Sequence, residues 1–134
     1  TEYRLAADSA PPKYNAVKIG LDWDRAVLYD RINKRVDLMI RQGLEQEVRG
    51  LCSERFLKST AAQAIGYKEM IAYFDGRMTL TEAIDAIKQG SRNYAKRQIS
   101  FFGADKDINK IAVTGKDLPC IINETEKLTG GLML

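Results

Sequence analysis

Alternating hydrophobic and polar positions predict two short strands, one near each end of the chain. The first strand is defined by apolar residues at every second position, namely Val17, Ile19 and Leu21. This alternation is typical of a strand with one buried face. The next convincing candidate is residues 108–113, far away along the chain. We therefore expect the first strand to pair with a segment outside this sequence.

Hydrophobic residues at helical spacing predict five helices between and after these strands. The predicted helices span about residues 24–43, 44–51, 61–74, 79–102 and 117–128. Asp24 can cap the first helix, because its carboxylate accepts hydrogen bonds from free amide groups at a helix start. Thr79 and Glu82 match a capping box at the start of the long helix. The inward face of that helix is predicted to consist of Ala83, Ile84, Ile87, Ser91, Tyr94 and Gln98.

Composition favours one globular, soluble domain. The 134 residues are 45% hydrophobic and 29% charged, which argues against disorder. No apolar run approaches the roughly 20 residues that a membrane helix needs. Cys52 and Cys120 fit no metal-ligand spacing, and two cysteines suit a reducing cytoplasm. The chain has no histidine, which excludes a histidine base, the usual catalytic triad and a histidine-ligated zinc site.

The net charge of +3 is too small to indicate a nucleic-acid partner, so the distribution of charge has to decide. Lys88, Arg92 and Lys96 recur at every fourth position of the long predicted helix and therefore form one stripe. No acidic residue occurs between Asp85 and Asp105, so we expect these cations to be free of ion pairs. Such a stripe suits a phosphate backbone. The alternative is an ordinary solvated helix face.

Gly66 is unexpected within the predicted third helix, where glycine costs about 1 kcal/mol relative to alanine. Close approach of a nucleic acid or another chain would explain it, and so would a tight helix crossing. Tyr94, Phe101 and Phe102 lie beside the basic stripe. They are candidates for stacking on unpaired bases, with packing in the core as the alternative.

No phosphate-binding site is predicted within these residues. A glycine-rich phosphate loop of the form G-x-x-x-x-G-K-[ST] is absent, and Gly115 with Lys116 is only a partial match. Four aspartates in the first part of the chain are assigned to helix caps and surface ion pairs rather than to a metal site. These are Asp22, Asp24, Asp30 and Asp37.

Three segments, in this order and spacing, are distinctive. They are LYDRINKRVDLM at 28–39, QAIGYKE at 63–69 and YAKRQISFF at 94–102. Together they resemble the tRNA dimethylallyltransferase family, also called tRNA isopentenyltransferases. The likeness covers roughly residues 14–113. It implies a mainly α fold with one or two short strands, forming the helical carboxy-terminal part of an α/β transferase of the phosphate-loop type. The predicted divisions are a linker at 1–13, a tRNA-contacting region at 14–113 and a terminal helix and tail at 114–134.

The resemblance implies an enzyme that transfers a dimethylallyl group from dimethylallyl diphosphate to N6 of the adenosine 3′ of the anticodon, assisted by Mg²⁺. The family's phosphate loop and catalytic base lie in its amino-terminal half. We therefore expect no catalytic residue, metal site or cofactor within this chain. The expected partner is the anticodon stem-loop of tRNA, and self-association through the exposed strand is a further expectation. A non-catalytic RNA-binding helical module and a purely structural helical domain are the alternatives.

Two segments are similar to family regions that contact substrate tRNA. The implied contacts are Gln63, Ala64, Ile65, Gly66, Tyr67 and Lys68 in the first segment, and Lys96, Arg97, Gln98, Ile99, Ser100, Phe101, Phe102 and Gly103 in the second. Family members commonly carry an arginine where this chain has Gly103. A contact from that arginine must here be lost or supplied by another residue.

Overall fold

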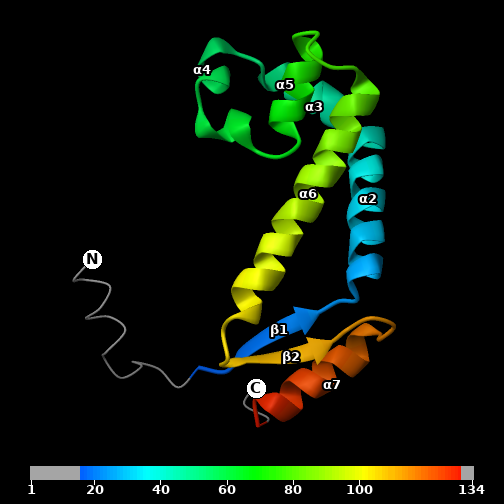
Figure 1. Ribbon diagram of the computed structural model, residues 1–134, viewed down its shortest axis with the longest axis vertical. Coiled ribbons are helices and arrows are strands. Elements are labelled where there is room, and N and C mark those ends of the chain that lie inside the picture. Colours follow the sequence, from blue (N-terminus) through cyan, green and yellow to red (C-terminus); the bar gives the residue numbers. More distant parts are fainter. Residues whose placement is uncertain (1–15, 131–134) are drawn as a thin grey trace, which may run out of the picture. The chain divides into compact units, whose positions relative to one another are not determined.

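A computed structural model describes residues 16–130 of the chain as two compact units (Figure 1). The first unit contains the described residues up to Asp22 and those from Lys106 onward, and the second contains Trp23–Asp105. The predicted linker at residues 1–13 lies outside the described residues. The division expected between residues 113 and 114 stays a prediction.

The second unit is entirely helical. Its elements are α2 (Arg25–Arg41), α3 (Leu44–Leu51), α4 (Glu54–Leu57), the 3₁₀ helix η1 (Thr60–Gln63), α5 (Tyr67–Phe74) and α6 (Leu80–Gly103). The first, second and long predicted helices are confirmed, whereas the short helix α4 was missed. With two short strands in the other unit, the mainly α fold class is confirmed.

The long helix α6 lies beside both α2 and α5, and their apolar faces meet in one core (Figure 1). Its buried members are Val36, Leu44, Val48, Met70, Ala83 and Ile87. Burial of these side chains supplies most of the stability of the unit, because individual helices of this length are marginal in water.

Helix caps follow the sequence closely. The Asp24 carboxylate accepts from the amides of Ala26 (2.9 Å) and Val27 (3.1 Å). At the start of α6 the Thr79 amide donates to Glu82 (2.7 Å), and the Glu82 amide donates to the Thr79 hydroxyl (3.3 Å). The hydrogen bond from the Thr79 backbone lowers the pKa of Glu82. Both predicted caps are therefore confirmed.

The predicted third helix at 61–74 is wrong in its first half. A 3₁₀ turn ends at Gln63, and α5 begins only at Tyr67. Between them Gly66 adopts φ +101° and ψ −48°, a conformation that side-chain-bearing residues rarely adopt. Gly66 is thus the residue that precedes a helix, not one inside it. Its conformation explains the glycine without a helix crossing.

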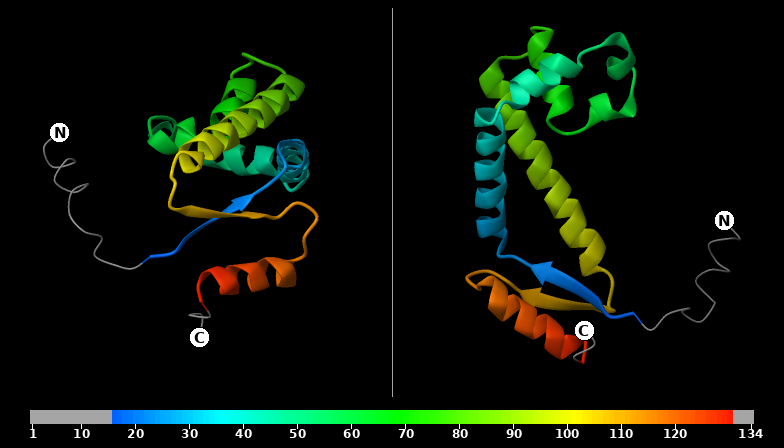
Figure 2. Two further views of the ribbon diagram at one scale, coloured as in Figure 1. Left: turned by 60° about the horizontal axis from the view of Figure 1, so that its bottom comes forward. Right: turned by 180° about the vertical axis from the view of Figure 1, so that it is seen from behind.

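The first unit contains a parallel pair of strands, β1 (Lys18–Asp22) and β2 (Ile108–Ala112), with α7 (Leu118–Leu128) against β2. The strands lie side by side in both views of Figure 2. Lys18 is opposite Ile108 and Asp22 is opposite Ala112. β1 therefore has a neighbour within this chain, and its expected pairing with a segment outside the sequence stays a prediction. Self-association through a strand edge stays a prediction.

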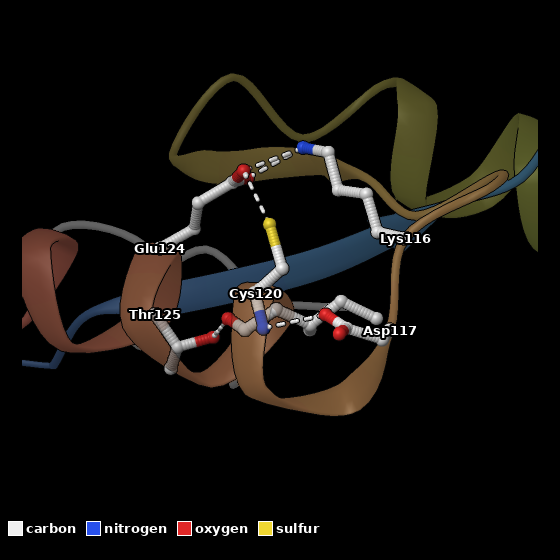
Figure 3. Close-up of polar contacts among 6 residues, drawn as sticks. Lys116, Asp117, Cys120, Glu124 and Thr125 are labelled. Carbon is white, nitrogen blue, oxygen red and sulfur yellow. Dashed lines mark hydrogen bonds and ion pairs between the residues drawn. The ribbon is translucent and has the colours of Figure 1, made fainter.

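A polar cluster ties α7 to the loop that precedes it (Figure 3). Lys116 Nζ donates to both carboxylate oxygens of Glu124, at 2.6 and 2.8 Å. The Cys120 thiol lies 3.8 Å from the same carboxylate, and Asp117 caps the helix through the Cys120 amide. The hydrogen bond from Lys116 lowers the pKa of Glu124. These contacts fix the start of α7 as the sequence predicted.

Candidate nucleic-acid interface

The first predicted contact segment, Gln63 to Lys68, is a corner between η1 and α5. Gln63, Ala64 and Lys68 are exposed, whereas Gly66 is buried. The Ala64 carbonyl accepts from the amides of Tyr67 (3.1 Å) and Lys68 (3.2 Å), which closes the turn. The corner therefore presents its outer residues to solvent while Gly66 faces the helical core.

A buried carboxylate holds this corner from below. The Gly66 amide donates to Glu69 Oε2 at 2.8 Å, and Lys68 Nζ lies 3.6 Å from Glu69 Oε1. Glu69 is only 7% exposed. This is half of a capping box, because Gly66 has no side chain with which to reciprocate. The hydrogen bond fixes the one residue of the corner that has the widest conformational freedom.

Tyr67 links α5 to α3. Its hydroxyl donates to Glu47 Oε1 at 2.5 Å, and its ring lies 5.9 Å from that of Phe56. This hydrogen bond, together with burial and the nearby Glu47 charge, raises the pKa of Tyr67 above its ordinary value of 10.0. Of the first contact segment, Tyr67 is thus a residue whose side chain already has partners within the helical unit, Glu47 and Phe56.

The raised pKa of Tyr67 predicts a pH-dependent contribution to stability. The group holds its proton more tightly in the folded state, so the contribution is fully present below about pH 10 and is lost as the pH rises through the folded-state pKa. We expect Tyr67→Phe to destabilise the chain at pH 7 and to differ less from wild type at pH 11. Urea unfolding followed by fluorescence of Trp23 measures both. Tyr94→Phe is the control. If the difference in unfolding free energy between Tyr67→Phe and wild type were the same at pH 7 and pH 11, the prediction would be contradicted.

The second predicted contact segment, Lys96 to Gly103, forms the last two turns of α6. All eight of its residues are exposed, including Phe101 at 74% and Phe102 at 52%. The two rings contact each other edge to face, with centroids 5.2 Å apart. Tyr94 is 51% exposed. Within the helical unit these aromatic side chains do not form part of the core, so the core alternative is wrong for all three, and the predicted inward face of the helix is wrong at Tyr94 and Gln98, which are exposed.

In the basic stripe Lys88 is paired with a carboxylate, whereas Arg92 is held only by neutral side chains. Lys88 pairs with Asp37 of α2 at 2.6 Å, so the expectation that this lysine lacks an ion pair is wrong. The physical reason is that the carboxylate comes from the neighbouring helix rather than from α6 itself. Arg92 donates to Asn33 (2.5 Å) and Gln89 (2.7 Å), neither of which is charged.

Lys96 and Arg97 keep their charge available. Within residues 16–130 neither side chain forms an ion pair with a carboxylate. The Arg97 guanidinium lies 5.5 Å from the centre of the Tyr94 ring. A cation stacked on an exposed aromatic ring presents both charge and a flat surface on one side of the helix. This end of α6 is therefore suited to a phosphate backbone with unpaired bases.

A half-open apolar cavity lies between α2, α6 and the corner, within the helical unit. It measures about 390 Å³ and is lined by Ile32, Arg35, Val36, Met39, Ile65, Ile87, Ser91 and Tyr94. Ile65 belongs to the first contact segment, and Tyr94 is two residues before the second. The structure thus brings the first segment, through Ile65, and the turn of α6 that precedes the second segment to one cavity wall, which the sequence did not indicate.

Comparison with known proteins decides the family. The sequence model of the IPP transferase family matches residues 2–105. The chain belongs to the IPP transferase family. It is 43% identical over 131 residues to the tRNA dimethylallyltransferase of Halalkalibacterium halodurans, which covers 98% of this chain and 42% of that protein. It is also 51% identical over 105 residues to the tRNA dimethylallyltransferase of Bacillus subtilis, covering 78% of this chain and 32% of that protein.

Solved structures of IPP transferases share the fold. The full-length tRNA isopentenylpyrophosphate transferase of Bacillus halodurans matches with a TM-score of 0.84 at 42% identity, covering 94% of this chain and 42% of that one. The tRNA delta(2)-isopentenylpyrophosphate transferase of Staphylococcus epidermidis also matches with a TM-score of 0.84, at 33% identity, with 97% and 42% covered. The chain therefore spans about two fifths of the length of these relatives.

Three residues of this candidate site were missed by sequence reasoning. Glu47 and Glu69 support the corner, and Arg35 adds a cation to the cavity wall. Glu69 could have been predicted from the sequence, because it lies three residues after Gly66 at a helix start, which is the spacing of a capping box. The assignment of acidic residues to caps and ion pairs is confirmed for Asp24, Asp30 and Asp37.

Proposed function

We propose that the chain supplies the tRNA-binding part of a tRNA dimethylallyltransferase. The reaction proposed for that enzyme moves a dimethylallyl group from dimethylallyl diphosphate to N6 of the adenosine 3′ of the anticodon. Relatives named tRNA dimethylallyltransferase support the transfer of a dimethylallyl group to tRNA, and the proposed partner of this chain is the anticodon stem-loop. The proposed location is the cytoplasm, which the two free, exposed cysteines suit.

The observation that carries the proposal is the open end of α6. Lys96 and Arg97 are exposed cations without carboxylate partners among the described residues, and Phe101 and Phe102 follow them on the same exposed segment. RNA recognition commonly combines cations for phosphates with aromatic rings for unpaired bases. A merely solvated helix face would not require two adjacent exposed phenylalanines.

The apolar cavity adds support. A base that is to be modified must leave its stack and enter a pocket, where apolar walls cover its faces. At about 390 Å³ the cavity falls within the range of roughly 300–1,000 Å³ typical of small-molecule sites. Ile65 of the first proposed contact segment borders it, and so does Tyr94, two residues before the second.

The chemistry itself is not assigned to these residues. Over residues 16–130 no group of three or more histidine, cysteine, aspartate or glutamate side chains is arranged to hold a metal ion. Mg²⁺ is proposed for the transferase as a whole, and no step of the proposal runs through a metal held by this part of the chain. In the same range no helix is long and apolar enough to cross a membrane.

Removing Lys96 and Arg97 tests the proposal. We expect the Lys96→Ala/Arg97→Ala double variant to bind an anticodon stem-loop RNA about tenfold more weakly or worse, with a salt slope reduced by about one to two units. Fluorescence anisotropy with a labelled stem-loop at several salt concentrations measures both quantities. The control is Lys34→Ala/Arg77→Ala. It removes two positive charges as well, but from side chains that already form ion pairs with Asp30 and Asp75.

Equal weakening by the two double variants would reject a specific face, and unchanged binding by both would reject the proposal. A non-catalytic RNA-binding module is the second candidate, because the open end of α6 would serve it equally well. The reading frame upstream of Thr1 separates the two. A phosphate-loop motif there supports the transferase, whereas a start codon without such a motif supports the module.

A further inference from the structure

Glu69 occupies an unusual position for a carboxylate. Among residues 16–130 it is the one charged residue that is buried, and it lies directly under a surface corner. A buried carboxylate is costly unless hydrogen bonds compensate for the water it loses. Here the Gly66 amide at 2.8 Å and the Lys68 ammonium at 3.6 Å provide that compensation.

We infer that Glu69 is a positioning residue for tRNA binding, which holds the corner at Gln63 to Gly66 in the conformation that RNA contacts. This inference rests on the proposed function and extends it to a residue that does not touch the RNA. Gly66 alone has wide conformational freedom, so without an acceptor below it the corner would sample several conformations. Fixing it beforehand spares the ordering cost that binding would otherwise include.

The contacts around Glu69 indicate that it positions the corner as well as capping the start of α5. The amide of Gly66 points inward to Glu69, so the exposed side of the corner is formed by Gln63 and Ala64. Within the described residues the Ile65 amide has no hydrogen-bond partner in the chain, and it lies on the same stretch of backbone. Glu69 thus determines which backbone and side-chain groups remain available outside. Lys68 offsets its negative charge, which would otherwise repel phosphates.

The acceptor and the charge of Glu69 are separable by substitution. Glu69→Gln keeps an oxygen that accepts from the Gly66 amide and removes the charge, whereas Glu69→Ala removes both. We expect Glu69→Ala to bind the anticodon stem-loop RNA about tenfold more weakly and Glu69→Gln to stay within about threefold of wild type. Binding is measured by anisotropy at a temperature where unfolding curves show every variant to be folded.

Two further measurements exclude a purely structural effect. Val48→Ala truncates a fully buried side chain of α3 and should lower stability without changing RNA affinity. Hydrogen exchange of the Gly66 amide, followed by NMR, should accelerate in Glu69→Ala and remain slow in Glu69→Gln. Wild-type affinity in Glu69→Ala, equal weakening in Val48→Ala, or unchanged Gly66 exchange would each overturn the inference.

Failure of this inference is distinguishable from failure of the proposed function. If Lys96→Ala/Arg97→Ala weakens RNA binding while Glu69→Ala does not, the tRNA-binding face stands and the positioning role is wrong. If the wild-type chain does not bind the stem-loop, both are wrong.

Discussion

Replacing Gly66 by valine is expected to lower the free energy of unfolding of the helical unit by about 1–3 kcal/mol. The reason is the backbone, because a β-branched residue at φ +101° and ψ −48° is a strong conformational outlier. Space is not the reason, since a Cβ at Gly66 would meet only Leu44 Cδ2 at an ordinary 3.9 Å. Urea unfolding followed by fluorescence of Trp23, the single tryptophan, measures the effect.

Gly50→Val is the matched control for this prediction. Gly50 lies within α3, has no positive φ, and a Cβ there would meet nothing within 4 Å. Valine at this position is expected to leave stability nearly unchanged or slightly increased, because glycine is a poor helix former. If Gly66→Val were as stable as Gly50→Val but bound RNA poorly, backbone strain would be the wrong explanation and close approach of RNA the better one.

Local signals made much of the fold predictable from sequence. Asp24 and Thr79 cap the helices that they were expected to cap, because a cap depends on residues only two or three positions apart. The strand pattern at β1 also depends on neighbouring residues. Its pairing with β2 does not, since strands so far apart along the chain are brought together by tertiary structure alone.

The candidate site was only partly predictable for the same reason. The sequence correctly predicted a row of cations along α6. It did not predict the ion pair of Lys88 with Asp37, which depends on how α2 packs against α6. Likewise the hydrogen bond from Tyr67 to Glu47 joins two helices and has no sequence signature. Spacing along one helix identifies a face, whereas neighbouring elements determine which part of that face remains free. In this chain the free part begins at Lys96.

The two halves of α6 should therefore respond oppositely to truncation. Ile87 is 1% exposed in the core, and Ile87→Ala is expected to cost about 2–5 kcal/mol of unfolding free energy. Phe101 is 74% exposed, so Phe101→Ala should change that energy by less than about 0.5 kcal/mol. RNA binding should show the reverse order, because a base stacked on an aromatic ring contributes roughly 1–3 kcal/mol. Unfolding curves and stem-loop anisotropy on both variants test this. A large stability loss in Phe101→Ala would mean that this ring packs against the protein and is not free for RNA.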